Sequence, residues 1–453
     1  MSMKNGEKKR SIMKKVLIAD AILGLLLIVV LLFGGASLKA KHAAEERAAA
    51  AQAEAERIAA AQAREEEEAA KRKEQEDAEA AAIEAEKAEA ERIAAAQAEA
   101  QAEAERIAAE QAAAETTVHL TMVGDVLLSS MIDAACQLPD GGYDFNVMFE
   151  NVIPYLADYD LKIVNEETAC GGAEFGISGY PSFNSPHEAQ DAIANAGFNC
   201  ICTASNHMLD LGTGPLFSSL NYWKTAYPDM PVIGSYDSQE ASDQIYYYEK
   251  DGFRIAILNY TYGSNAGSGE YYDAPWSVNM LYEDEVRNDI RIAKENSDYV
   301  IVCPHWGTEY TLSNDDYQAM WAQIFLQEGV DLVLGTHPHV PEPIEVFNRE
   351  DGHQMICYYS LGNFISNQDA AYSLVGGMAD VTIRKTAEGV VVDDFGIVPI
   401  VTHKSSYYTT YLLKDYNNDM AWGSLGVATD PDFSWDYCVN LVTSMYGDRL
   451  RNF

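Results

Sequence analysis

The sequence has few basic residues and no paired cysteine motif. Its 453 residues include 31 Lys and Arg against 70 Asp and Glu, which gives a formal net charge of -39. A nucleic acid would be repelled by that charge, so the composition argues against nucleic-acid binding. The seven cysteines form no Cys-x-x-Cys pair, which excludes a zinc ribbon and a thioredoxin-like motif. Their odd number leaves at least one unpaired in a monomer, and four lie in apolar runs, where we expect small buried residues: Cys200, Cys202, Cys303 and Cys357.

The apolar run from Val16 to Leu38 contains a single charged residue, Asp20. A helix needs about 20 apolar residues to span a bilayer, and a basic flank stays in the cytoplasm. We therefore expect residues 1–42 to form a basic tail and a transmembrane anchor, with the rest of the chain outside the cell membrane. A cleaved signal peptide with its apolar region at Ala21–Phe33 is the alternative, and it also exports everything downstream. The basic flank consists of Lys4, Lys8, Lys9, Arg10, Lys14 and Lys15.

Residues 43–115 lack glycine and proline and consist mostly of alanine and glutamate, which are strong helix formers. The segment Ala-Glu-Ala-Glu-Arg-Ile-Ala-Ala begins at Ala53, Ala88 and Ala102, at separations that are multiples of seven. Its isoleucines therefore share one heptad position, as in a coiled coil. The alternative is a single solvated helix stabilised by charge pairs four residues apart. Either form is a helical stalk of roughly 110 Å at 1.5 Å per residue.

From Thr116 onward, short apolar runs alternate with segments of helical spacing. This alternation predicts a layered α/β fold with buried sheets, in which loops beyond the carboxyl ends of the strands build the site. We expect this domain over residues 116–402, followed by a C-terminal extension, 403–453. Strands are expected near 118–125, 160–167, 198–204, 254–260, 299–303, 331–334 and 355–359, and helices near 145–158, 187–197 and 315–327.

One strand end carries two histidines, in Gly335-Thr-His-Pro-His-Val340. Histidines two residues apart on an extended backbone point to the same side, and Pro338 disfavours a helical conformation for His337. Two neutral imidazoles that converge from one strand end indicate a divalent-metal site. A surface turn that carries two histidines is the alternative interpretation.

Other strand ends carry polar residues of the types that such a site needs. An isolated buried carboxylate is costly, whereas a divalent ion satisfies carboxylates, imidazoles and amides together. Each residue has an ordinary interpretation, such as a turn or a helix cap, but their joint occurrence favours a metal site. The residues are Asp125, Asn165, Glu167, Asn206, His207, His305, His337, His339 and Asn363.

These strand ends carry motifs that resemble those of the capsule-synthesis CapA family. The similarity covers about Val118 to Asn367, with the motifs in family order. It implies the calcineurin-like metallophosphoesterase fold, a layered αββα sandwich, and a role in capsule or poly-γ-glutamate production. The motifs are Gly124-Asp125, Asn165-Glu166-Glu167, Ala204-Ser-Asn-His-Met-Leu-Asp-Leu-Gly212, His305-Trp-Gly-Thr-Glu-Tyr310, Gly335-Thr-His-Pro-His-Val340 and Tyr359-Ser-Leu-Gly-Asn-Phe364.

The resemblance also implies roles for single residues. His207 would be the acid/base, and Asn165 and Asn363 would support the ligands of one or two divalent ions, Mn²⁺, Fe, Zn²⁺ or Mg²⁺. The sequence departs from the phosphoesterase pattern in two places. The phosphoesterase pattern opens with Asp-x-His, but here Val126 and Leu127 follow Asp125. In the middle motif, Glu167 stands where phosphoesterases use an Asp. The implied metal ligands are Asp125, Glu167, Asn206, His305, His337 and His339.

Taken together, these features predict an exported, membrane-anchored, metal-dependent protein of capsule or poly-γ-glutamate biosynthesis or export. Its expected partners are the membrane and the other proteins that synthesise and export the polymer. If the protein is catalytic, the expected reaction is hydrolysis or transfer at a phosphoester or an amide, with a metal-activated water as nucleophile. The alternative is a non-catalytic scaffold of the polymer-export complex.

Overall fold

The computed structural model describes residues 52, 54, 57, 71–75, 77–103, 115–265 and 274–453. The chain divides into two compact units, Met1–Ala104 and Glu105–Phe453. The predicted anchor at Val16–Leu38 lies outside the described residues. Among the residues that are described, no helix is both long enough and apolar enough to cross a membrane.

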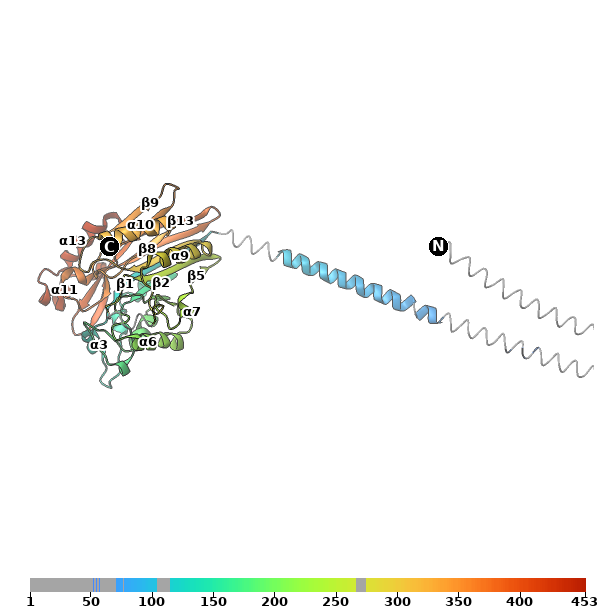
Figure 1. Ribbon diagram of the computed structural model, residues 1–453, viewed down its shortest axis with the longest axis horizontal. Coiled ribbons are helices and arrows are strands. Elements are labelled where there is room, and N and C mark those ends of the chain that lie inside the picture. Colours follow the sequence, from blue (N-terminus) through green and yellow to red (C-terminus); the bar gives the residue numbers. More distant parts are fainter. Residues whose placement is uncertain are drawn as a thin grey trace, which may run out of the picture. The chain divides into compact units, whose positions relative to one another are not determined.

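The described residues of the first unit are helical, as their composition predicts (Figure 1). They include 71–75 and 77–103, which belong to the predicted stalk. Charge pairs of helical spacing connect Arg92 with Glu89 at 2.9 Å and Lys87 with Glu91 at 4.0 Å. Ile83 is 62% exposed, so in the single chain the predicted heptad seam is uncovered at this residue.

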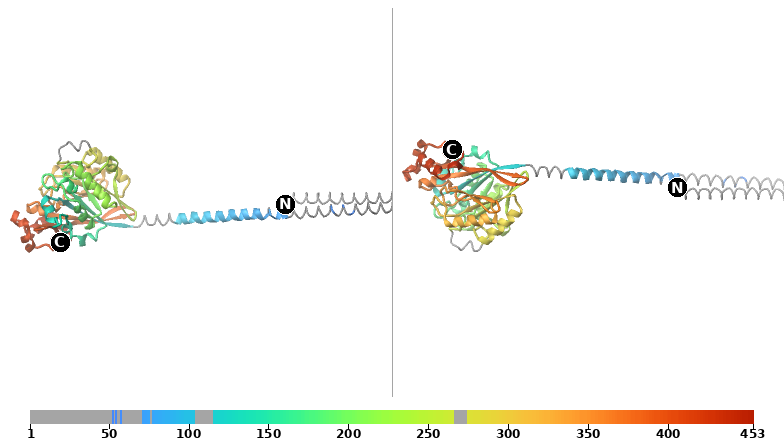
Figure 2. Two further views of the ribbon diagram at one scale, coloured as in Figure 1. Left: turned by 90° about the horizontal axis from the view of Figure 1, so that it is seen from below. Right: turned by 90° about the horizontal axis from the view of Figure 1, so that it is seen from above.

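The second unit contains two mixed β-sheets (Figures 1 and 2). The larger sheet has the strand order β14-β13-β12-β1-β2-β3-β4, with β11 paired to β1, and the smaller has the order β5-β6-β7-β8-β10-β9. The larger sheet consists of β1 (Thr116–Val126), β2 (Leu161–Glu166), β3 (Cys200–Cys202), β4 (Val232–Ile233), β11 (Asn363–Ile365), β12 (Val375–Thr386), β13 (Gly389–Lys404) and β14 (Tyr408–Leu412). The smaller consists of β5 (Tyr246–Lys250), β6 (Phe253–Thr261), β7 (Tyr299–His305), β8 (Leu332–Leu334), β9 (Ile344–Asn348) and β10 (Gln354–Tyr358).

Helices cover the outer faces of both sheets. On the larger sheet, residues of α3, η1, α4, α5 and α6 pack in one apolar cluster with Val123, Val164 and Ile201. On the smaller sheet, α9 and α10 pack with Val300 and Val333. The α-helices among the described residues of the second unit are α3 (Ser130–Cys136), α4 (Ile153–Leu156), α5 (Glu188–Asn195), α6 (Thr213–Ala226), α7 (Gln239–Ser242), α9 (Glu283–Glu295), α10 (Asp316–Glu328), α11 (Asn418–Gly423), α12 (Leu425–Thr429) and α13 (Trp435–Tyr446). The 3-10 helices are η1 (Asn146–Met148), η2 (Ala173–Phe175), η3 (Ala371–Leu374), η4 (Leu413–Asp415) and η5 (Gly447–Arg449).

The central core lies between the two sheets. Leu120 and Ile163 of the larger sheet pack in one cluster with Ile301 and Leu332 of the smaller sheet, and all four are fully buried. Because successive side chains of a strand point to opposite faces, the same strands also supply the outer clusters. The order of layers is therefore helix, sheet, sheet, helix, and the α/β class predicted from the sequence is confirmed.

The last 51 residues of the chain belong to this sandwich. The predicted boundary after residue 402 falls inside β13, which continues to Lys404 and pairs with β14. Cys438, Val442 and Tyr446 of α13, red in Figure 2, join the central core. Residues 403–453 therefore extend the same unit.

The helix predicted for residues 145–158 is present only as the short helices η1 and α4. Pro154 lies in the first turn of α4. Proline has no backbone N–H to donate to a preceding turn, so it begins a helix more readily than it continues one. The segment still buries Phe149 and Leu156, whose helical spacing gave rise to the prediction.

Candidate metal centre

Polar side chains gather where parallel strands of both sheets end. Asp125 is near the end of β1, Glu167 directly follows β2, and His305 is the last residue of β7. Their side chains are completely buried. The carboxyl ends of parallel strands meet at one edge of a sheet, so residues far apart in sequence converge there.

A bulge in β1 sets the position of Asp125. The register between β1 and β2 shifts between Val123 and Asp125, which leaves Gly124 as the extra residue. Only a glycine fits, because a Cβ atom at this position would collide with the carbonyl oxygen of Gly362. The same carbonyl accepts a hydrogen bond from the Asp125 N–H at 3.0 Å. This contact holds Asp125 beside the segment between β10 and β11, where Gly362 lies.

The His-Pro-His stretch follows β8, but its backbone is not extended. His337 has φ 97° and His339 has φ 59°, both in the left-handed region, so the predicted extended conformation is wrong. Such conformations cost about 1–3 kcal/mol each in a residue other than glycine and persist where the surroundings hold them. The Asp125 carboxylate does so here, because it accepts a hydrogen bond from the His337 N–H at 3.3 Å. The two imidazole rings nevertheless lie close together, with ring centroids 5.8 Å apart.

Glu167 occupies the middle of the cluster. Its Oε1 lies 3.6 Å from Nε2 of His305 and 3.6 Å from Nε2 of His339. Neither of its carboxylate oxygens has a hydrogen-bond partner among the described residues, and the same is true of His337 Nδ1. Buried polar atoms are normally paired, so these three unpaired atoms indicate a missing partner.

The two asparagines that the sequence suggests contact Asp125 and His339. Oδ1 of Asp125 accepts a hydrogen bond from Asn165 Nδ2 at 2.8 Å, and Oδ2 of the same carboxylate lies 3.1 Å from Nδ1 of His339. Asn363 places Oδ1 3.1 Å from the same imidazole nitrogen and donates to the His339 carbonyl through Nδ2 at 3.2 Å. Both asparagines therefore contact a predicted ligand.

His305 is fixed through both of its ring nitrogens. Nε2 lies 2.8 Å from Asn206 Oδ1, and Nδ1 lies 3.0 Å from the Thr336 hydroxyl. The sequence analysis assigned no role to Thr336, although it lies in the same motif as the two histidines. An outer partner of this kind orients the ring of a metal-ligating histidine.

Burial governs the ionisation of the cluster. Desolvation raises the pKa of Glu167 well above its ordinary value, although the neighbouring His339 opposes the shift. Desolvation lowers the pKa of His305 and His337 well below the ordinary value, which keeps both imidazoles neutral. Burial also lowers the pKa of His339, but Glu167 and Asp125 outweigh it and raise that pKa to about 9. Neutral imidazole is the form that binds metals, so His305 and His337 are ready to ligate at neutral pH.

These donors fit a divalent ion. Glu167, His305 and His337 form one group, here called the first metal position, and Asp125, Glu167 and His339 form another, the second metal position. Within each group the donor atoms lie no more than 4.8 Å from one another. Imidazole suits Zn²⁺ and Fe, and carboxylate oxygen also suits Mn²⁺ and Mg²⁺. The two positions contain five of the six predicted ligands, and the sixth, Asn206, contacts His305.

His207 lies beside the cluster and belongs to neither metal position. Its Nδ1 is 2.7 Å from Oδ2 of Asp210, and both side chains are nearly buried. Phe183 packs its ring edge against the imidazole at 4.6 Å and donates its backbone N–H to Asp210 at 2.9 Å. The sequence analysis did not single out Asp210, although it is three residues after His207 in the quoted motif. A carboxylate on Nδ1 orients the ring and leaves Nε2 as the nitrogen that can exchange a proton.

A second residue without an assigned role is Glu309. Its exposed carboxylate forms a further group of close donor atoms with His337 and His339. Glu309 lies four positions after His305, in the motif His305-Trp-Gly-Thr-Glu-Tyr310. The sequence alone predicts a role for the histidine of this motif but none for the glutamate.

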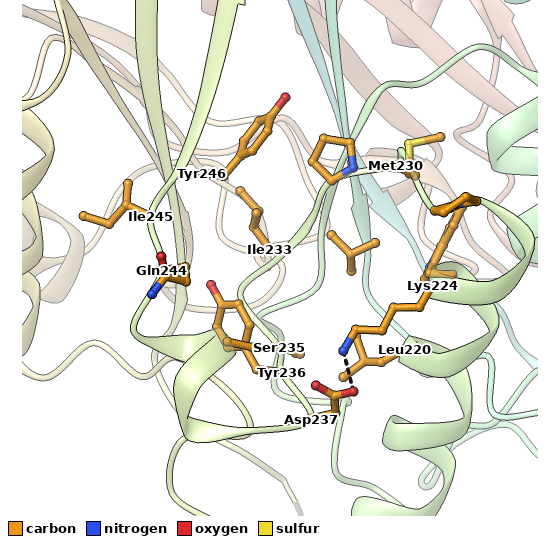
Figure 3. Close-up of a pocket in the computed structure, with 15 residues that line it drawn as sticks. Leu220, Lys224, Met230, Ile233, Ser235, Tyr236, Asp237, Gln244, Ile245 and Tyr246 are labelled. Carbon is orange, nitrogen blue, oxygen red and sulfur yellow. Dashed lines mark hydrogen bonds and ion pairs between the residues drawn. The ribbon is translucent and has the colours of Figure 1, made fainter.

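A separate cavity of about 420 Å³ lies between α6 and the edge strands β4 and β5 (Figure 3). Its walls are largely apolar, with Leu220, Ile233 and Tyr246 among them, and Lys224 pairs with Asp237. The lining contains neither histidine nor cysteine. The candidate metal ligands therefore lie at the strand ends and not in this cavity.

Comparisons with known proteins identify relatives of the chain. The family described as "Bacterial capsule synthesis protein PGA_cap" matches residues 119–368. The capsule biosynthesis protein CapA of Bacillus anthracis is 28% identical over 261 residues, which cover 55% of this chain and 60% of that protein. The PGA biosynthesis protein CapA of Bacillus subtilis (strain 168) is 29% identical over 220 residues, or 48% of this chain and 55% of that protein.

The match to both relatives is therefore partial, and it spans less than two thirds of the length of each. Among solved structures, the calcineurin-like phosphoesterase YfkN from Bacillus subtilis is similar to the chain, with a TM-score of 0.36 and 10% identity. That comparison covers 73% of this chain and 97% of YfkN. The family match extends over more than half of the chain and includes every residue of the two metal positions. The chain thus belongs to the PGA_cap family of bacterial capsule synthesis proteins.

Proposed function

We propose that this chain is an exported protein of capsule or poly-γ-glutamate biosynthesis, anchored to the cell membrane by Val16–Leu38, whose second unit is a metal-dependent hydrolase or transferase. The bond it cleaves is a phosphoester or an amide. The family and the two CapA relatives support the biosynthetic role. The donor groups at the strand ends support the metal dependence.

One observation carries the chemical part of the proposal. Glu167 is completely buried, and it lies between two imidazoles with both carboxylate oxygens unpaired among the described residues. Leaving a carboxylate without a partner in the interior costs free energy, and a divalent cation is the partner that its neighbours can also share. If Glu167 only packed in the interior, an apolar side chain would fill its place at a lower cost in free energy.

The residues around the cluster have separable tasks in such a reaction. When bound, a divalent ion supplies Lewis-acid chemistry and makes a water acidic enough to be a nucleophile at neutral pH. Asn206 and Thr336 hold the His305 ring in place. His207, oriented by Asp210, would donate a proton to the leaving group or accept one from the nucleophile. Burial of the donor set keeps bulk water from competing for it.

The experiment is an assay of the purified full chain with Mn²⁺, Zn²⁺ or Mg²⁺ on two probes, bis-p-nitrophenyl phosphate and γ-glutamyl-p-nitroanilide. We expect metal-dependent turnover of one of them, which is lost in Glu167→Gln because the substitution removes the central charge. The matched control is Glu350→Gln, a change of the same charge at an exposed turn residue between β9 and β10. It should keep the parental rate.

Polymer formation in cells separates this proposal from a scaffold. A strain that lacks the gene should regain capsule polymer with the parental chain and with Glu350→Gln, but not with Glu167→Gln. If Glu167→Gln restores the polymer fully and neither probe is turned over, the chain acts as a non-catalytic part of the export complex and the hydrolase proposal is wrong.

A further inference from the structure

The two metal positions share a donor, which leaves the second position short of ligands. Glu167 belongs to both, so Asp125 and His339 are the donors that the second position has to itself. The strand β1 offers no further help, because Val126 and Leu127 follow Asp125 and are buried apolar residues. Zn²⁺ takes at least four ligands and Mg²⁺ takes six, so the position has room for another protein donor beside water.

Glu309 lies where such a donor is needed. Its carboxylate is within 4.8 Å of donor nitrogens of both His337 and His339. His339 is also a donor of the second metal position, so Glu309 lies next to that position. Both carboxylate oxygens of Glu167, a donor of the second position, are buried and have no hydrogen-bond partner among the described residues. These unpaired oxygens are an independent sign that a cation is missing there.

The loop after β7 is built to hold Glu309 in this place. Gly307 has φ 94°, and a Cβ atom there would collide with the Gln318 side chain. Tyr310 has φ 61° and donates its N–H to the carbonyl of Pro338, between the two histidines, at 2.8 Å. On the other side, the Thr308 hydroxyl donates to Asp315, the N-cap residue of α10, at 2.6 Å. Strain at a residue such as Tyr310 persists where the surrounding structure fixes it.

The negative charges of the carboxylates around His339 also favour the binding of more than one cation. Asp125, Glu167 and Glu309 each place a carboxylate oxygen within 4.8 Å of a ring nitrogen of His339. Among the described residues, Asp125 and Glu167 form close charge contacts with histidines and with no Lys or Arg. One divalent ion would leave the three carboxylates under-compensated, whereas two ions would neutralise them and leave a charge for an anionic nucleophile or substrate.

We propose that Glu309 is a ligand of a second divalent ion, held together with Asp125, Glu167 and His339. The inference deepens the proposed function and rests on it, because it concerns the same site. It gives the loop after β7 two roles: His305 serves the first metal position and Glu309 the second. An exposed ligand also implies that the second ion exchanges faster than the first.

The test is a titration of the metal-free full chain with Mn²⁺, followed by calorimetry, elemental analysis and electron paramagnetic resonance. We expect the parent to bind two ions per chain and to show the signal of a spin-coupled manganese pair, since ions that share a carboxylate lie about 4 Å apart. Glu309→Gln should keep the tighter ion and bind the second at least about 10-fold more weakly. Its spectrum should be that of an isolated Mn²⁺. Glu309→Asp keeps the charge on a shorter side chain and should recover part of the second affinity.

Glu350→Gln is the matched control, because it removes an exposed carboxylate far along the chain from the loop after β7. It should bind two ions like the parent. Binding of two ions by Glu309→Gln with parental affinities overturns the inference, as does equal loss of both ions, or a parent that binds only one. These outcomes leave the proposed function standing. A parent that binds no metal at all defeats the proposed function itself.

Discussion

At the scale of single residues, five side chains from four strand ends form the two metal positions. All five are among the six ligands that the resemblance implies, and they converge because the carboxyl ends of parallel strands meet. The motifs contain Glu309 and Asp210, but the sequence predicts no role for either residue. Their contacts depend on the path of loops, which the sequence does not reveal. The left-handed backbone of His337 and His339 was unexpected for a similar reason. It depends on hydrogen bonds from distant segments.

His207 provides a prediction at this scale. Replacing it by Ala should leave the metal content unchanged, because its ring belongs to neither metal position. Turnover should fall by about 10²- to 10⁴-fold if it exchanges a proton in the reaction. Asp210→Asn should reduce turnover less and shift its pH profile, because the substitution changes only the residue that contacts Nδ1 of His207. Loss of metal from His207→Ala would show instead that this histidine is a ligand.

A second residue-scale prediction concerns the buried Glu342. Burial raises its pKa to about 8, although a hydrogen bond from Gln318 at 2.7 Å opposes the shift. Because the folded-state pKa lies above the unfolded one, the folded state binds the proton more tightly. The stabilisation is complete below about pH 4.5 and is lost as the pH rises toward about 8. The slope from this one group is about 1.4 kcal/mol per pH unit in that window.

Urea unfolding of the parent and of Glu342→Gln at pH 5 and pH 9 tests this prediction. The free energy of unfolding should fall less with pH in the variant, because glutamine does not ionise. At pH 9 the variant should be the more stable of the two. An equal loss of stability in both proteins would show that Glu342 is not the group that titrates.

At the scale of elements, strands were predicted more reliably than helices. The apolar runs at β1, β2, β6, β7, β8 and β10 lie at or within a few residues of the predicted places, because a buried parallel strand has a compact signal. A capping box of Asp315 and Gln318 begins α10 at the predicted place. The segment around Pro154 was predicted as one helix because its apolar spacing is helical, but tertiary packing satisfies that spacing with two short turns. No strand is predicted for β12 to β14, which lie beyond the last site motif.

The helical stalk supplies the prediction at this scale. Residues 105–453 form a compact unit, and both metal positions lie inside it. A chain that begins at Glu105 should therefore keep its fold and bind metal with the affinity of the full chain. Circular dichroism and a metal titration of the shortened and full chains check this expectation. A shortened chain that folds but has lost its metal would mean that the preceding residues contribute to the site.

At the scale of the whole molecule, the layered α/β class followed from the alternation of elements, and the position of the site followed from the carboxyl ends of parallel strands. The extent of the domain was less predictable. Residues 403–453 contain no site motif, yet they complete the larger sheet and part of the central core. They contribute buried apolar side chains and no predicted site residue. The assignment of export and anchoring to Val16–Leu38 stays a prediction from composition.

The central claim is that the strand ends hold a divalent ion, and elemental analysis of the purified full chain tests it most directly. We predict at least one bound ion per chain in the parent and in His353→Ala, a control that removes a half-buried histidine from the turn between β9 and β10. His337→Ala should lose metal, because it removes a buried donor of the first metal position. A parent without metal, or a His337→Ala variant that binds metal as tightly as the parent, would contradict the account.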